Sequence, residues 1–268
     1  MSVEITSYRF HVGIAAQLGK CYLRQGRLSE ATTILEESTG VIESKGLRGM
    51  WSSDTFNAFA GLWLARAERW QGTERRKFLR EARRWCRRAL RCTRDALGWL
   101  PETQRLQGTL AWLSGKPANA NIHWKTSLAT AEQAGMPVER TRLLLEMGAR
   151  HGDAALVEEA RHVFEQSGTN VDLAFSLHAL ARIAATAGSD TNTTLRHHDR
   201  AITALDAVKA EYNLGLARRE RAQLLTRWGR RDEAQADLAR ARCSFEVIGA
   251  DAEKAEAEKA GLARGRSE

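Results

Sequence analysis

The sequence has little proline and few β-branched aliphatic residues. Its 268 residues include 3 prolines, where average usage would give about 13. Valine and isoleucine together occur 17 times, against 42 alanines. Alanine is the strongest helix former, whereas strands favour valine and isoleucine, so this bias speaks against a β-sheet. The composition therefore predicts a chain built from helices.

Long apolar runs and a secretion signal are also missing. No stretch approaches the roughly 18 uncharged apolar residues that a membrane-spanning helix needs. Residues 1–20 do not follow the basic-then-apolar order of a secretion signal. The apolar fraction of 43% is nevertheless large enough for a buried core, which excludes general disorder. We therefore expect a folded, cytoplasmic chain that does not bind membranes.

Cysteine and histidine are too scattered to form a recognisable metal or redox site. The four cysteines include no C-x-x-C pair, so we expect buried small apolar side chains in a reducing compartment at Cys21, Cys86, Cys92 and Cys243. The histidine pair at 197–198 does not indicate a metal site, because adjacent residues on a helix point about 100° apart.

Catalytic signatures are missing as well. The stretch from Gly108 to Lys116 is not a phosphate-binding loop, because its spacing is two residues too long and Pro117 replaces the required hydroxyl residue. No G-x-S-x-G or H-E-x-x-H motif occurs. We therefore expect a protein that is not an enzyme and has no catalytic, cofactor-binding or metal-binding residues.

What the sequence does have is an internal repeat of turns and helix faces. Six turn glycines lie 36 to 46 residues apart, a spacing that suits paired helices: Gly26, Gly72, Gly115, Gly152, Gly188 and Gly229. After each turn, a small–large–small triplet recurs at i, i+4 and i+7, on one helical stripe. The triplets are Ala31/Leu35/Ser38, Ala82/Cys86/Ala89, Ala120/Trp124/Ser127, Ala160/Phe164/Ser167, Ala201/Leu205/Val208 and Ala234/Leu238/Ala241. Small residues at the ends let helix backbones approach closely while the central residue fills the gap.

This pattern predicts an all-α fold of about six antiparallel helix pairs in a single domain over residues 1–268. The pairs are expected near 7–44, 54–98, 102–134, 138–167, 171–210 and 213–247, and a capping helix is expected over 250–264. Pro101, Pro117 and Pro137 fall at expected helix starts, where the missing N–H of proline costs nothing. The polar segment 189–194 is expected to be a longer loop.

Two stretches resemble a known repeat family. Residues 18–35 read L-G-x-x-Y, then G-x-x-x-E-A, then A-x-x-x-L, and residues 215–248 are similar. This pattern resembles the tetratricopeptide repeat, which implies a right-handed α-solenoid that binds proteins or peptides. Residues 101–167 also resemble the C-terminal repeat arrays of large bacterial signalling ATPases. That resemblance implies a regulatory or sensing region. In that family the arrays follow an ATPase core, often beside a class III nucleotide cyclase or kinase domain, and this sequence contains none of these catalytic domains.

In tetratricopeptide arrays the first helices line a concave groove, and the groove positions of the family can be carried over to this chain. Cations outnumber carboxylates at these positions, so the resemblance implies a positive groove for an acidic protein or peptide, with aromatic anchors beside the charges. The expected groove residues are Arg24, Arg66, Arg69, Trp70, Arg105, Trp112, Arg142, Arg150, Phe175, Arg182, Arg219 and Arg227. The alternative is that Trp70 and Trp112 belong to the core and that Arg142 and Arg150 form ordinary helical ion pairs.

Two further surfaces bear on possible partners. Residues 75–94 carry nine arginines on one amphipathic helix. We interpret their exposed face as solvated, because no aromatic residues interleave with the charges, and we expect no nucleic-acid partner. The N-terminal helix has apolar residues and no preceding capping pair. This predicts either that the chain corresponds to the C-terminal end of a longer array or that its N-terminal face pairs with another molecule, as in self-association through that end. A second functional hypothesis is a stand-alone regulator that binds an anionic small ligand or signalling peptide in the groove.

Overall fold

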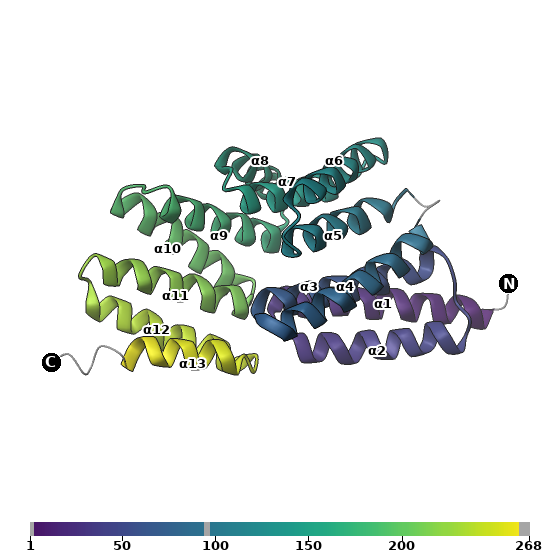
Figure 1. Cartoon of the computed structure of the whole chain (residues 1–268), viewed down its shortest axis with the longest axis horizontal. Coiled ribbons are helices and arrows are strands. Elements are labelled where there is room, and N and C mark those ends of the chain that lie inside the picture. Colours follow the sequence, from purple (N-terminus) through teal and green to yellow (C-terminus); the bar gives the residue numbers. More distant parts are fainter. Residues whose placement is uncertain (1–2, 94–96, 263–268) are drawn as a thin grey trace. The chain divides into compact units, whose positions relative to one another are not determined.

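The computed structural model is an array of α-helices that pack antiparallel to their neighbours (Figure 1). It describes residues 3–93 and 97–262, and no strand occurs among them. The thirteen helices of these residues are α1 (Val3–Gln25), α2 (Leu28–Ser44), α3 (Met50–Arg69), α4 (Gly72–Thr93), α5 (Leu100–Leu113), α6 (Pro117–Gln133), α7 (Pro137–His151), α8 (Ala154–Ser167), α9 (Asn170–Thr186), α10 (Thr191–Ala207), α11 (Glu211–Arg227), α12 (Arg231–Val247) and α13 (Asp251–Leu262). The prediction of an all-α fold is confirmed.

Local signals set most of the helix ends. All six predicted turn glycines have positive φ angles, between 63° and 86°, a backbone conformation that glycine adopts without steric cost. Pro101 lies in the first turn of α5, and Pro117 and Pro137 are the first residues of α6 and α7. Helix ends near these residues therefore agree with the sequence within a few positions.

Three helices begin four residues earlier than expected, and the first of them is α1, which begins at Val3 instead of near residue 7. The segment 189–194 is not a longer loop, because α10 begins at Thr191 and the Asp190 carboxylate caps it by accepting a hydrogen bond from the Thr193 N–H at 3.0 Å. Helix α3 begins at Met50 rather than near residue 54. As a result, Asp54 lies in the second turn of a helix instead of at its start.

The predicted triplets form the contact stripes of the second helices. Sixteen of their eighteen residues are buried, whereas Val208 is partly buried and Ser167 is exposed. Glycines on the facing helices allow the close approach: a Cβ at Gly108 would lie 2.2 Å from the Trp124 ring, and one at Gly19 would lie 2.7 Å from Leu35. Helix pairs therefore pack with a large side chain against a bare backbone.

Contacts divide the chain into two compact units. Unit 1 comprises Met1–Leu23 and Leu28–Leu143, and unit 2 comprises Arg24–Arg27 and Leu144–Glu268. In unit 1 the core joins α1 to α5, with Phe59 stacked on Trp85 at 4.3 Å between ring centroids. The prediction of a single domain over residues 1–268 stays a prediction.

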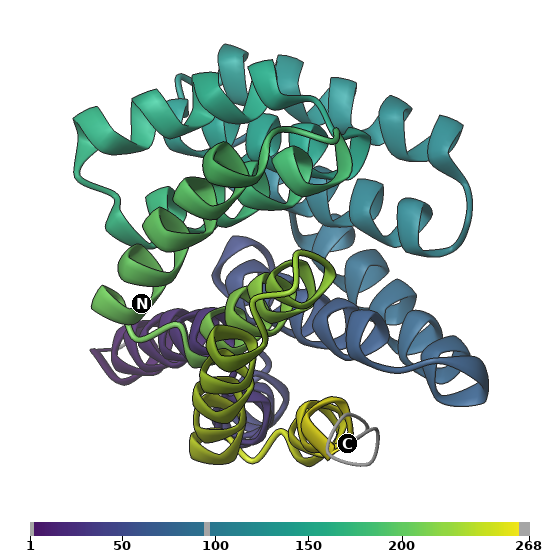
Figure 2. The ribbon, with the colours of Figure 1, turned by 90° about the vertical axis from the view of Figure 1, so that its left-hand side faces the viewer.

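Unit 2 ends in a layer of three helices. Helices α11, α12 and α13 lie side by side in both views (Figures 1 and 2). Phe245 is fully buried between them, in contact with Tyr212, and the Tyr212 hydroxyl donates a hydrogen bond to Glu253 at 3.1 Å. Helix α13 lies within the span 250–264 that the sequence predicts for a capping helix, and residues 263–264 of that span lie outside the described residues.

The structure tests two further sequence predictions, that the four cysteines are buried and that no helix spans a membrane. Cys86 is buried, and burial raises the pKa of its thiol to about 12. Cys92 is partly buried, but Cys21 and Cys243 are exposed, so the prediction of buried cysteines is wrong for these two. No described helix is long and apolar enough to cross a membrane.

Candidate functional site

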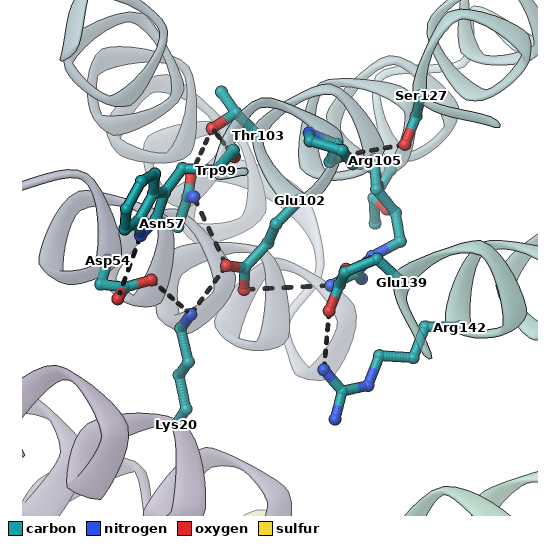
Figure 3. Close-up of polar contacts among 12 residues, drawn as sticks. Lys20, Asp54, Asn57, Trp99, Glu102, Thr103, Arg105, Ser127, Glu139 and Arg142 are labelled. Atoms are coloured by element: carbon teal, nitrogen blue, oxygen red, sulfur yellow. Dashed lines mark hydrogen bonds and ion pairs between the residues drawn. The ribbon is translucent and has the colours of Figure 1, made fainter. Parts of the chain in front are cut away.

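A chain of charged side chains within unit 1 joins residues of α1, α3, α5 and the first part of α7 (Figure 3). The Lys20 ammonium of α1 lies 3.1 Å from the Asp54 carboxylate of α3 and 2.7 Å from the Glu102 carboxylate of α5. Arg105 of α5 and Arg142 of α7 then contact Glu139 at 3.6 and 2.7 Å. We call these six residues the charged network: Lys20, Asp54, Glu102, Arg105, Glu139 and Arg142.

Neutral side chains complete the network. The Asn57 amide, 1% exposed, lies 3.5 Å from Glu102 and accepts a hydrogen bond from the Thr103 hydroxyl at 2.9 Å. The Trp99 indole N–H donates to Asp54 at 3.4 Å. These three contacts join α3 to α5 and to Trp99 directly before it, so they hold α3 and α5 in one register.

The network keeps its central groups ionised. Burial alone would raise the pKa of the Glu102 carboxyl, but the charges of Lys20 and Arg105 hold it below its ordinary value. Burial alone would lower the pKa of Lys20, and the Glu102 and Asp54 carboxylates raise it above its ordinary value instead. Both ends of the central ion pair are therefore charged at neutral pH.

Charge in the network is balanced. Three cations face three carboxylates, and each cation lies within 4.0 Å of at least one of them. One of the three carboxylates, Asp54, is not among the groove positions carried over from the repeat family, so the count of charges at those positions omits it. This part of the expected groove therefore carries no excess of positive charge.

An apolar groove adjoins the network. It has a volume of about 450 Å³ and is bordered by α1, the first turns of α3 and Trp99, with Asp54 shared between groove and network. Its large apolar side chains are 39 to 68% exposed: Phe10, Ile14, Leu18, Met50 and Trp51. The first three recur every fourth residue on α1, so they form one stripe along the helix. We call these five residues the apolar groove.

The other groove residues predicted in unit 1 face several directions. Arg66 is half-buried, donates to the Thr32 hydroxyl of α2 at 2.8 Å and lies over the Trp63 ring. Trp70 caps the end of α3 and is 38% exposed, and Trp112 packs partly buried against Trp124 at 5.7 Å between ring centroids. Arg69, at the end of α3, is partly exposed. Arg24, at the end of α1, belongs to unit 2 and pairs with the Asp172 carboxylate of α9 at 3.0 Å. The binding role of all five stays a prediction.

In unit 2 the predicted residues are engaged within the unit or lie at its surface. Arg150 pairs with Glu146 at 3.0 Å, and Arg219 pairs with Glu256 of α13 at 2.6 Å. Phe175 packs partly buried against a core of α9, α10 and α11 residues. Two more, Arg182 and Arg227, are exposed and line a pocket between the same three helices.

The sequence missed the most exposed part of the groove. Phe10 and Ile14 stand out as apolar residues without a capping pair, but they indicate an end surface rather than a groove. Met50 and Trp51 precede residue 54, the expected start of the second helix pair, so the sequence assigns them to no helix. The available signal was the i, i+4, i+8 spacing of Phe10, Ile14 and Leu18.

Comparisons with protein-family models and with curated proteins find no relative of this chain. No protein-family model matches the chain, and no curated protein sequence matches it. The described residues contain no group of three or more His, Cys, Asp or Glu side chains placed to bind a metal ion. Functional inference therefore rests on the geometry of the site.

Proposed function

We propose that this protein is a non-enzymatic protein-interaction module and that the apolar groove of unit 1 binds an amphipathic helix of a partner protein. The observation that carries the proposal is the stripe of Phe10, Ile14 and Leu18, which is exposed beside Met50 and Trp51. Contiguous exposed apolar residues with polar groups at one edge are typical of protein-binding surfaces.

The shape of the groove favours a helix as the occupant. Side chains spaced four residues apart form a ridge along α1, and such ridges pack into the groove of another helix. The charged network at the edge holds α1 and α3 in place through Lys20 and Asp54, so the groove is preorganised. Recognition in this groove then depends mainly on apolar contacts, and Asp54 is the residue that the groove shares with the charged network.

The finer architecture belongs to the same proposal. The turn glycines, the buried triplets and the antiparallel packing support a tetratricopeptide-like, right-handed solenoid of about six helix pairs. A regulatory or sensing role beside a signalling ATPase rests on the sequence resemblance of residues 101–167 alone. A cytoplasmic location and an acidic partner stay predictions from the sequence.

A matched pair of surface positions tests the groove. A photoactivatable phenylalanine analogue is placed at Ile14 of α1 or at Ile122 of α6, two isoleucines that are each 62% exposed. After irradiation in the native cell, we expect one protein to be captured from Ile14 and not from Ile122. The sequence of the cross-linked segment should have the apolar spacing of an amphipathic helix.

Affinity measurements on the captured protein then decide the proposal. Ile14→Glu should weaken binding about 30-fold, the effect of losing a central contact of about 2 kcal/mol. Ile122→Glu should leave the affinity within about twofold, because this position lies on another surface. Equal capture from both positions, or unchanged affinity of Ile14→Glu with an intact helical spectrum, would contradict the proposal.

A further inference from the structure

Unit 2 contains a small pocket of different chemistry. It has a volume of about 190 Å³ and lies between α9, α10 and α11. Arg182, Thr186, Gln223 and Arg227 stand exposed around it, and His198 lies at its buried side. Because the pocket is formed by residues of unit 2 alone, it is independent of the apolar groove.

His198 is the unusual member of this pocket. His198 is fully buried, with 0% of its surface exposed. Neither ring nitrogen has a hydrogen-bond partner among the residues that the structure describes. Buried polar groups are nearly always hydrogen-bonded, because leaving one unpaired costs the desolvation of that group. The imidazole is therefore an unsatisfied donor and acceptor at the wall of the pocket. Both ring nitrogens are covered by neighbouring side chains, so a bound molecule reaches one of them only when a side chain at the pocket shifts.

Neighbouring charges define what the pocket can hold. Glu220 lies 2.9 Å from the His178 ring nitrogen and 3.4 Å from the Arg182 guanidinium, so both of its oxygens are engaged. Arg227 forms no ion pair within the described part of the chain. Two guanidinium groups and one carboxylate leave one positive charge at the pocket, which matches a monovalent anion better than a divalent one.

We propose that this pocket binds the carboxylate of a small organic monocarboxylic acid, with Arg227 pairing with the carboxylate and a ring N–H of His198 donating a hydrogen bond to it. A planar guanidinium matches the two oxygens of a carboxylate. The Leu224 and Ala185 walls fit a short apolar body. Burial lowers the pKa of His198 to about 4, so its ring is neutral at neutral pH and keeps one N–H for the ligand.

The same chemistry has two possible sources, a free acid or the side chain of an acidic peptide. Four probes separate them in buffer free of carboxylates and phosphate: sodium butyrate, the uncharged isostere butyramide, inorganic phosphate, and the capped tripeptide Ac-Ala-Glu-Ala-NH2. The readout is the imidazole resonances of the full-length protein labelled at its 7 histidines. The His198 signal is assigned by its loss in His198→Gln.

Butyrate should shift the His198 resonance and saturate in the millimolar range, as fits a ligand of few atoms. Butyramide should leave it unmoved, and phosphate should bind more weakly than butyrate. Binding of the tripeptide more tightly than butyrate would identify an acidic side chain as the natural source and still support the carboxylate site.

Rim variants give a test that does not depend on a buried substitution. Arg227→Gln should weaken butyrate binding about tenfold, whereas Arg242→Gln, an exposed arginine of α12 away from the pocket, should leave it within twofold. No shift of His198 with butyrate, an equal response to butyramide, tighter binding of phosphate, or equal affinity in Arg227→Gln and the wild type would each overturn the proposal.

Discussion

The two units treat a buried ionisable group in opposite ways. In unit 1, Glu102 lies within 4.0 Å of Lys20 and Arg105 and near the Asn57 amide, so its charge is compensated from three sides. In unit 2, His198 is more deeply buried and has no hydrogen-bond partner among the described residues. Ion pairs between helices hold the helices of unit 1 in place. A buried polar group without a hydrogen-bond partner lowers the stability of the fold, and this cost is offset only when the group binds a ligand.

The largest expected effect of this difference between the units is a loss of stability of unit 2 at acid pH. Burial, with Arg221 and His178 adding to it and Glu220 and Asp199 opposing it, lowers the pKa of His198 from 6.5 to about 4. Between pH 6.5 and pH 4, His198 therefore binds a proton in the unfolded chain but not in the folded chain. The free energy of unfolding falls as the pH drops below 6.5. Between pH 7.5 and pH 4 this group should cost about 3 kcal/mol.

Hydrogen exchange of the α10 amides measures this effect. Their opening free energy should fall with pH in the wild type and fall much less in His198→Leu. Equal pH profiles of the two proteins between pH 6.5 and pH 4 would show that His198 is not held neutral by burial.

Removing the centre of the charged network should have the next largest effect. Glu102→Ala leaves Lys20 and Arg105 facing each other without their shared carboxylate. We expect a loss of about 2 kcal/mol in urea unfolding, less than for a fully buried pair because the Glu102 side chain is 19% exposed. Glu165→Ala is the matched control: Glu165 also pairs with an arginine, at 2.8 Å, but is 55% exposed, so its loss should cost less than about 0.5 kcal/mol.

The pH dependence distinguishes this network from the pocket of unit 2. Because the pKa of Glu102 is lowered from 4.5, its contribution is present above pH 4.5 and is lost as the pH falls through the folded-state pKa. The stability difference between the wild type and Glu102→Gln should therefore be constant from pH 7.5 to pH 5 and shrink only below pH 4.5. A difference that already declines near pH 6 would contradict the assignment.

The smallest expected effect completes the comparison. His198→Leu removes two unpaired ring nitrogens and keeps an apolar side chain of similar size. It should change the free energy of unfolding at pH 7.5 by less than about 1 kcal/mol, in the stabilising direction if the cavity is filled. Butyrate binding should be lost in the same protein. A large destabilisation measured by thermal unfolding would assign His198 a structural role instead.

Local sequence signals predicted most of the fold, because helix ends depend on neighbouring residues. Gly115 and Gly152 end helix pairs through their positive φ angles, and Pro117 and Pro137 begin helices. One exception is the start of α10. Asp190 is its N-cap, so the helix begins at Thr191, within the segment 189–194 that the sequence predicts as a loop.

The candidate site was predicted less well, because it depends on contacts between residues distant in sequence. Lys20 and Glu102 are 82 positions apart, and nothing near either residue indicates the other. Counting charges along the first helices predicted a positive groove, yet Asp54 and Glu139 offset Lys20 and Arg105. A count of residue types does not say which side chains face each other.

The sequence by itself determined the helical fold, the helix order, the turns and the buried stripes, because each of these follows from backbone preferences and side-chain spacing within one helix or turn. Only the tertiary structure decided which charges are compensated, that Phe10, Ile14 and Leu18 border an open groove, and that His198 is buried without a partner. The physical reason is that ion pairing and burial are properties of the space between helices, and that space is set by packing across the whole unit.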